Sequence, residues 1–177
     1  MLTRRKFMMT TAALTVGGLA ARAGANTGTF EITRTEAEWR AQLTPAQFAV
    51  LREEATERAF TNELMGERSP LLKEDRVGNY NCAGCALPVY RSETKYDSQT
   101  GWPSYWDAIE DAVGTREDRS YLFMVRTEVH CARCGGHLGH IFDDGPEPTG
   151  ARHCINGLAM TFTPDATGVE EGHPVTA

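Results

Sequence analysis

Two pairs of cysteines carry the strongest chemical signal in this chain of 177 residues. Cys82 and Cys85 form one Cys-x-x-Cys pair, and Cys131 and Cys134 form the other. Each pair brings two sulfurs into one tight turn, so the two pairs together can surround an ion with four thiolates at about 2.3 Å. Four protein ligands leave no position open for water or substrate. The spacing therefore predicts one zinc ion that holds the fold together.

The same four cysteines allow two other interpretations. In an oxidising compartment they could form two disulfides, and an iron ion accepts the same set of four thiolates. We favour zinc, which would also keep these sulfurs out of redox chemistry.

The fifth cysteine, Cys154, is left over and is a candidate nucleophile. A lone cysteine is more often a small buried apolar residue. Here Arg152 and His153 precede it, and His137 and His140 could come close to it in the fold. Cationic and hydrogen-bonding neighbours lower the pKa of a thiol and make the reactive thiolate available. The spacing of the last two histidines is also compatible with metal binding or with a solvated strand end.

Two short helices are expected before the cysteine motifs. A capping-box pattern at Thr35 predicts a helix through Leu43, and a second one at Thr44, followed by Pro45, predicts another helix.

Beyond residue 80 the chain consists of short β-rich segments separated by Gly, Pro and Asp. The longest strands are expected at residues 121–130 and 157–163, which lead into or out of the cysteine motifs. The pattern predicts a mainly β domain with a twisted antiparallel sheet system and short N-terminal helices.

The first 25 residues have the layout of an export signal. Basic residues at 4–6 precede a mostly apolar stretch at 7–21, and small residues follow at 23–25. The paired arginines are typical of the twin-arginine route, which accepts folded proteins. The apolar stretch is interrupted by Thr and Gly and falls short of the ~20 apolar residues of a stable span, so we favour cleavage over an uncleaved anchor.

Without this signal the chain keeps 14 basic and 24 acidic residues, a formal charge of about −10. Such a surface disfavours binding to nucleic acid and to anionic lipid. We expect a periplasmic monomer with no stable membrane association.

Five further segments occur in an order that is typical of one family: GWPS at 101–104, VRTEV at 125–129, GHLGHIF at 136–142, DGPEPTG at 144–150 and RHCIN at 152–156. With the cysteine pairs, they make residues 43–164 resemble the methionine sulfoxide reductase B family. The resemblance implies a mainly β fold of two antiparallel, tent-like sheets with zinc at one edge. It divides the chain into the signal at 1–25, a leader with a short helix at 26–42, the reductase domain, and a flexible tail at 165–177.

The resemblance also implies roles for seven residues. Cys154 corresponds to the nucleophile, which takes the oxygen of methionine-R-sulfoxide and becomes a sulfenic acid. Trp102 corresponds to the indole that holds the methyl group of the substrate. Three polar residues correspond to groups that orient and protonate the oxygen, and two more support the pocket: His137, His140, Asn156, Phe142 and Arg152.

This sequence departs from the family at a position that matters for turnover. Thr100 stands where many members have a resolving cysteine, and no spare cysteine exists elsewhere. An external thiol, such as a thioredoxin-like protein of the periplasm, would then have to reduce the sulfenic acid. His153 replaces a common Tyr, 157–158 replace a Ser-Ala pair, and a common His is missing near Tyr121, which could take part of its role.

We therefore expect an enzyme that repairs oxidised methionine in envelope proteins. A zinc-bearing binding module that holds a ligand near Trp102 and His137 without redox chemistry is the alternative from another class. A general thiol oxidoreductase gains ground only if the cysteine pairs hold no metal.

Overall fold

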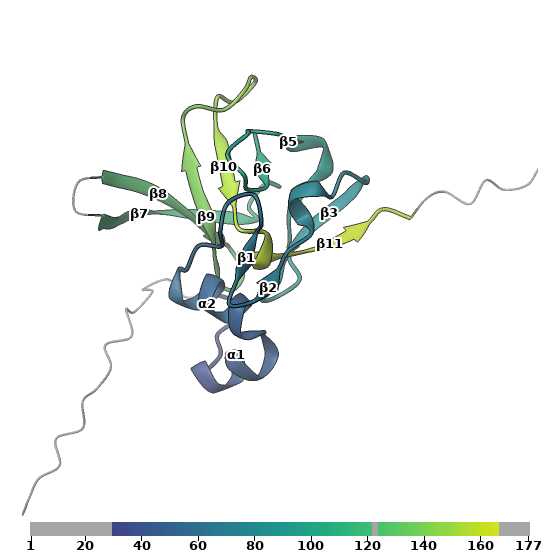
Figure 1. Ribbon diagram of the computed structural model, residues 1–177. Helices are drawn as coiled ribbons and strands as arrows, with labels where there is room; N and C mark the ends of the chain where they lie inside the picture. Colours follow the sequence, from purple (N-terminus) through teal and green to yellow (C-terminus); the bar gives the residue numbers. More distant parts are fainter. Residues whose placement is uncertain (1–29, 122–123, 167–177) are drawn as a thin grey trace, which may run out of the picture.

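The computed structural model describes residues 30–121 and 124–166 (Figure 1). The predicted signal at 1–25 and all but the first two residues of the predicted tail at 165–177 lie outside the described residues. Within these limits, no helix has both the length and the apolar character needed to cross a membrane.

The two N-terminal helices begin where the capping patterns predict. Thr35 caps α1 (Glu36–Gln42): its side chain accepts the N–H of the third helical residue, whose carboxylate accepts the N–H of Thr35. Thr44 caps α2 (Pro45–Glu53) in the same way, with Pro45 at the first helical position. Reciprocal capping satisfies backbone donors that would otherwise lack a partner, so short helices can form here.

The larger of the two main sheets has six antiparallel strands, and their spatial order differs from their chain order. The order is β5 (Lys95–Tyr96), β6 (Ser104–Tyr105), β10 (Arg152–Ile155), β9 (His137–Phe142), β8 (Met124–Cys131) and β7 (Val113–Tyr121). The last of these strands in the chain, β10, therefore lies inside the sheet rather than at its edge.

The second sheet has three antiparallel strands, in the order β11 (Met160–Pro164), β3 (Gly78–Cys82) and β4 (Pro88–Arg91). A short hairpin and three single-turn helices complete the described elements: β1 (Glu63–Leu64), β2 (Glu67–Arg68), η1 (Leu71–Lys73), η2 (Ser92–Thr94) and η3 (Gly157–Ala159). The prediction of a mainly β fold with two antiparallel sheets and short N-terminal helices is confirmed.

Both long strands were expected with wrong boundaries. Residue 121 is the last residue of β7, and β8 begins at Met124. The two strands pair with each other as a long hairpin. Strand β7 is rich in charge, but its side chains pair across the hairpin, with Arg116 opposite Glu128. Residues 157–159 form a turn and not a strand, because two of their backbone N–H groups are drawn to a buried carboxylate, described below.

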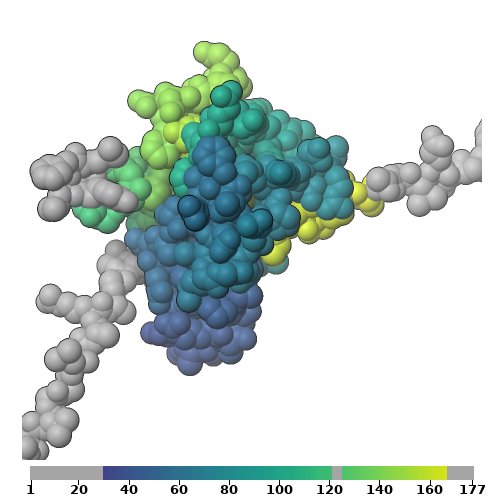
Figure 2. Space-filling view, viewed as in Figure 1, coloured from purple at the N-terminus to yellow at the C-terminus, as the bar shows by residue number. Residues whose placement is uncertain are grey.

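The core lies between the two sheets and contains a cluster of buried aromatic rings. Tyr90 stacks on Tyr105 with ring centroids 4.3 Å apart, and Tyr80 meets Tyr105 edge-on at 5.2 Å. Helix α2 packs against β9 and η3. The two helices form one end of the molecule, and the loop between β9 and β10 forms the opposite end (Figures 1 and 2).

Candidate active site

The register of the larger sheet sets Cys154 in a row with two polar residues. Cys154 on β10 pairs with Ser104 of β6 on one side and with His140 of β9 on the other. Directly paired residues point to the same face of a sheet, and successive residues alternate. His153 therefore points to the other face, where its Nδ1 lies 3.1 Å from the Tyr90 hydroxyl oxygen. The sheet separates Cys154 from this neighbour in sequence.

A small cavity of about 110 Å³ opens beside Cys154. Its lining combines a thiol, an imidazole, an amide and two aromatic rings: Thr56, Trp102, Arg126, Gly139, His140, Phe142, Cys154 and Asn156. Five of the seven residues with implied roles thus meet in one space. His137 and Arg152 do not line it.

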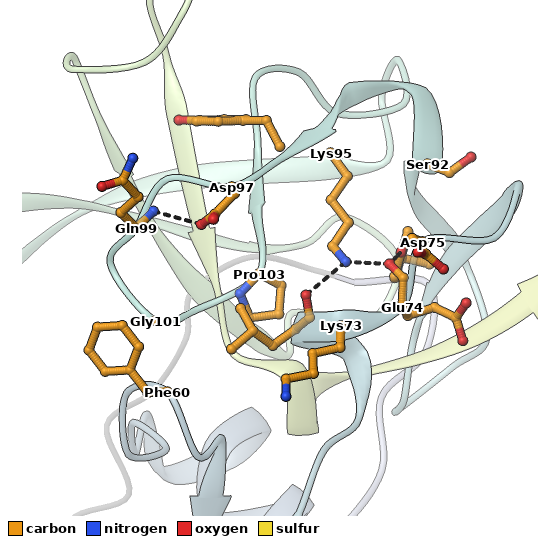
Figure 3. A pocket seen from close by; sticks show the side chains of 13 residues that line it. Phe60, Lys73, Glu74, Asp75, Ser92, Lys95, Asp97, Gln99, Gly101 and Pro103 are labelled. Atoms are coloured by element: carbon orange, nitrogen blue, oxygen red, sulfur yellow. Dashed lines mark hydrogen bonds between the residues drawn. The ribbon is translucent and has the colours of Figure 1, made fainter.

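A larger hollow of about 770 Å³ lies elsewhere on the surface (Figure 3). One of its charged groups is engaged with the protein: Lys95 Nζ donates to the carbonyl oxygens of Leu71 and Leu72 at 2.9 and 3.2 Å. The Gln99 backbone N–H donates to Asp97 Oδ1 at 2.8 Å. No thiol or imidazole lines this hollow, so we place the chemistry in the smaller cavity.

The backbone of one residue, Glu57, holds two walls of the small cavity. Trp102 Nε1 donates to the Glu57 carbonyl oxygen at 3.0 Å, and the Glu57 N–H donates to Asn156 Oδ1 at 3.1 Å. Asn156 Nδ2 donates to the Leu138 carbonyl oxygen at 3.1 Å. Its second hydrogen, which no acceptor in the described part of the chain takes up, is available to a ligand.

Glu57 is 1% exposed. Its side chain connects the segment around residue 57 to the segment that follows Cys154. Its carboxylate accepts the N–H groups of Gly157 and Leu158 at 2.7 and 2.9 Å and Nδ2 of Asn62 at 2.7 Å. Burial raises the pKa of Glu57, and the three donors oppose that shift. The bonds to Gly157 and Leu158 join parts of the chain about a hundred positions apart and fix the segment that follows Asn156.

His140 is held by a carboxylate on the neighbouring hairpin. Its Nε2 lies 2.9 Å from Asp118 Oδ2, and Arg126 donates to the same oxygen at 2.6 Å. Burial lowers the pKa of His140, while the contact with Asp118 opposes the shift. If Asp118 accepts the Nε2 proton, Nδ1 carries the lone pair in the neutral ring and donates only in the imidazolium.

His137 lies behind His140, with ring centroids 5.3 Å apart, and is 2% exposed. Its Nδ1 is 2.8 Å from Glu128 Oε1, and Glu128 also accepts from Arg116. The pKa of Glu128 is low because these contacts outweigh its burial. His137 Nε2 has no partner among the described residues. His137 therefore supports the cavity from behind in this structure.

Arg152 also acts from outside the cavity. Its guanidinium makes two hydrogen bonds to the Asp144 carboxylate, at 2.7 and 2.9 Å. The guanidinium carbon lies 4.3 Å from the centroid of the Phe142 ring, a cation–π distance. Asp144 and Phe142 thus fix Arg152, which in turn backs one aromatic wall.

The Cys154 thiol experiences opposing influences. Burial raises its pKa, whereas the Thr100 hydroxyl and the Arg152 guanidinium lower it. Thr100 Oγ1 lies 3.9 Å from Cys154 Sγ. The thiolate at this site depends on a few specific contacts because the surroundings are largely apolar.

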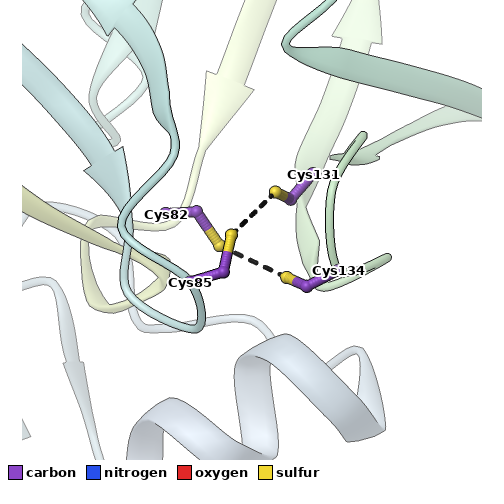
Figure 4. A group of neighbouring side chains, drawn as sticks. All are labelled: Cys82, Cys85, Cys131 and Cys134. Carbon is purple, nitrogen blue, oxygen red and sulfur yellow. Dashed lines mark hydrogen bonds between the residues drawn. The ribbon is translucent and has the colours of Figure 1, made fainter. Parts of the chain in front are cut away.

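Four other sulfurs gather at the far ends of β3 and β8 (Figure 4). All ligand atoms of Cys82, Cys85, Cys131 and Cys134 lie within 4.8 Å of one another. Two of these pairs, Cys85–Cys131 and Cys82–Cys134, have sulfurs 3.5 and 3.7 Å apart. A disulfide needs about 2.05 Å, whereas sulfurs bound at about 2.3 Å to one tetrahedral ion lie about 3.8 Å apart. The donor set and spacing fit a metal ion.

Several known proteins are similar to this chain in sequence. A family model described as the SelR domain matches residues 43–164. A peptide methionine sulfoxide reductase MsrB of Agrobacterium fabrum is 47% identical over 134 residues, which cover 76% of this chain and 94% of that protein. The protein of the same name from Methanosarcina mazei is 47% identical over 143 residues, covering 80% of this chain and 96% of that protein.

This chain belongs to the methionine sulfoxide reductase B family. Among solved structures, a Mis18 'Yippee-like' domain aligns with a TM-score of 0.41 at 19% identity, over 50% of this chain and 96% of that chain.

Several residues of this reductase B site were not predicted from the sequence. Glu57 and Asp118 act through contacts that no short motif shows, and Thr100 was noted only as a replacement. Arg126 lies inside a quoted segment but received no role. The side chain of Tyr121, with its suggested role, lies outside the described residues.

Replacing Glu57 with glutamine is expected to destabilise this reductase B domain by about 1–3 kcal/mol, because the amide N–H₂ would replace either the oxygen that accepts from Leu158 or the oxygen that accepts from Gly157 and Asn62. Urea denaturation measures the effect. Glu53→Gln, on an exposed position of α2, is the matched control and should change stability by less than about 0.5 kcal/mol. Equal stability of the two variants would contradict the role of Glu57.

Proposed function

We propose that this member of the family reduces methionine-R-sulfoxide in proteins, with Cys154 as the nucleophile. The Cys154 thiolate attacks the sulfoxide sulfur and forms an S–S bond while a proton is delivered to the oxygen. The S–O and S–S bonds then break as the hydroxyl passes to the sulfur of Cys154. The products are methionine and a sulfenic acid on Cys154. No other redox partner is needed for this first half of the cycle.

One observation supports this proposal most directly: Cys154 and His140 are paired across β10 and β9 and line one small cavity with two aromatic walls. The thiolate can reach the sulfur, His140 and the Asn156 amide can donate to the oxygen, and Trp102 with Phe142 can receive the methyl end. The imidazolium form of His140 would supply the proton, and Asp118 stabilises that form.

We infer that the metal held by the four clustered cysteines is zinc. Zinc prefers a closed tetrahedral shell of four thiolates and has no redox chemistry of its own. It would stabilise the ends of β3 and β8 and keep four thiols out of reaction with the Cys154 sulfenic acid.

We further propose that an external thiol protein of the thioredoxin type completes the cycle. With four cysteines gathered at the metal centre, Cys154 is the one thiol left in the sequence. A second thiol must then come from outside, attack the sulfenic acid and release water. Residues 1–25 support export by the twin-arginine route, and we propose that the mature protein acts as a monomer in the periplasm, where it repairs proteins of the cell envelope.

Single-turnover reduction tests the proposal. Pre-reduced, metal-bound mature protein is mixed with peptides that contain the separated R and S sulfoxides, without external thiol. We expect about one equivalent of methionine from the R form only, and a trapped sulfenic acid on Cys154. No methionine from either form, with the metal still bound, would instead favour a binding module that uses the Trp102 wall to hold a ligand.

A further inference from the structure

Three hydroxyl groups connect the Cys154 sulfur to a backbone carbonyl, and we call them the hydroxyl row: Thr100, Ser98 and Ser104. Cys154 Sγ is 3.9 Å from Thr100 Oγ1, which is 2.8 Å from Ser98 Oγ. Ser98 Oγ is 2.7 Å from Ser104 Oγ, and Ser104 donates to the Trp102 carbonyl oxygen at 3.2 Å. Ser104 is fully buried, and Thr100 and Ser98 are partly buried.

The number of hydrogens fixes the direction of this row. A carbonyl only accepts, so the single hydrogen of Ser104 is used on Trp102. Ser98 must then donate to Ser104, Thr100 must donate to Ser98, and the neutral Cys154 thiol must donate to Thr100. With Cys154 protonated, every hydrogen of the row therefore points away from the sulfur.

Ionisation of Cys154 reverses this arrangement. A thiolate only accepts, so the Thr100 hydrogen turns toward the sulfur. Ser98 can then donate to Thr100, and Ser104 can donate to Ser98. We propose that the hydroxyl row sets the reactivity of Cys154: Thr100 donates to the thiolate, and Ser98 and Ser104 are positioning residues that support this donation by reversing their own hydrogen bonds. This inference rests on Cys154 being the nucleophile.

Two cationic or potentially cationic groups near Cys154 are also engaged by carboxylates. The Arg152 guanidinium shares its charge with Asp144 through two hydrogen bonds. His140 binds Asp118 through one ring nitrogen, and burial lowers the pKa of its imidazole. The Thr100 hydroxyl lies 3.9 Å from the sulfur and, together with the Arg152 guanidinium, lowers the pKa of Cys154. A single hydrogen bond to the sulfur should therefore have a measurable effect.

The loop that carries the hydroxyl row is closely constrained, so Thr100 cannot easily move away. Asp97 accepts the N–H of Gln99 at 2.8 Å, and the Gly101 carbonyl accepts the Phe60 N–H at 2.8 Å. Gly101 has a φ of +90°, and a Cβ there would lie 2.6 Å from the Phe60 nitrogen. These contacts hold the segment beside β10 without using the hydroxyl of Thr100.

The test is the rate at which iodoacetamide alkylates Cys154 in the metal-bound protein as a function of pH, followed by mass spectrometry. Thr100→Val keeps the shape of the side chain but removes the hydroxyl. We expect the midpoint of the pH profile to rise by about one unit and the rate at pH 7 to fall about tenfold, the change that one pKa unit produces. Thr100→Ser restores the hydroxyl and should stay within about twofold of the wild type.

Ser98→Ala separates the row from Thr100 alone. This variant keeps Thr100 but removes the Ser98 hydroxyl that would donate to it. That donation stabilises the thiolate state more than the thiol state, so we expect alkylation of Cys154 to be about threefold slower. A wild-type profile for Thr100→Val would overturn the proposal, and a wild-type profile for Ser98→Ala would overturn the role of the row. Alkylation needs no sulfoxide, so these outcomes are independent of whether the reductase activity itself is found.

Discussion

Cys154→Ser is expected to abolish methionine sulfoxide reduction, with a loss of roughly 10⁴-fold or more, because it removes the proposed nucleophile. A hydroxyl at this position is much harder to ionise than a thiol, and the cavity offers no base placed to activate it other than His140, which Asp118 already engages. The measurement is the formation of methionine from an oxidised peptide, with excess dithiol as the reductant.

The control for this variant is its structure. Cys154 is not one of the clustered sulfurs, so Cys154→Ser should bind one equivalent of metal and unfold at the same temperature as the wild type within a few degrees. Turnover within tenfold of the wild type would show that another group attacks the sulfoxide, and the mechanism would have to be abandoned.

Loss of the metal is expected to unfold the domain. Structural zinc sites bind with apparent free energies of about 10–16 kcal/mol, whereas whole domains are stable by only about 5–15 kcal/mol. Replacing Cys131, which is buried at the end of β8, should therefore cost more free energy than the whole domain has as its free energy of unfolding. We expect Cys131→Ser to contain no metal, to lose its near-ultraviolet circular dichroism and to show no cooperative thermal transition.

A strong chelator should have the same effect on the wild-type protein, and added zinc should restore the signal after the chelator is removed. A metal-free variant with a cooperative transition near that of the wild type would show that the four thiols stabilise the fold without an ion. Metal analysis of the native protein distinguishes zinc from iron in the same experiment.

The features that were predictable from sequence are those set by short-range rules. A capping box needs only residues within one turn, so Thr35 and Thr44 locate both helices. The two cysteine pairs have to converge because each supplies half of a metal shell, and their sulfurs do cluster. These parts of the fold depend on spacing along the chain and not on how distant segments pack.

The parts that sequence could not provide depend on register and on distant contacts. The direction of His153 follows from the pairing of β10 with β6 and β9, and a shift by one residue would exchange it with Cys154. Glu57 bonds to residues about a hundred positions away, and its importance has no local pattern. Strand β7 was not predicted because it is rich in charged residues. Their partners lie on the other strand of the hairpin, and the sequence does not show that pairing.

The position of β10 also has a consequence for how the protein is made. This strand enters the larger sheet between β6 and β9, although every other strand of that sheet precedes it in the chain. While the nascent polypeptide is still on the ribosome, all four sulfurs of the metal centre emerge before Cys154 does. A newly synthesised chain can therefore bind a metal ion at the four cysteines before Cys154 emerges and before β10 fills the gap between β6 and β9.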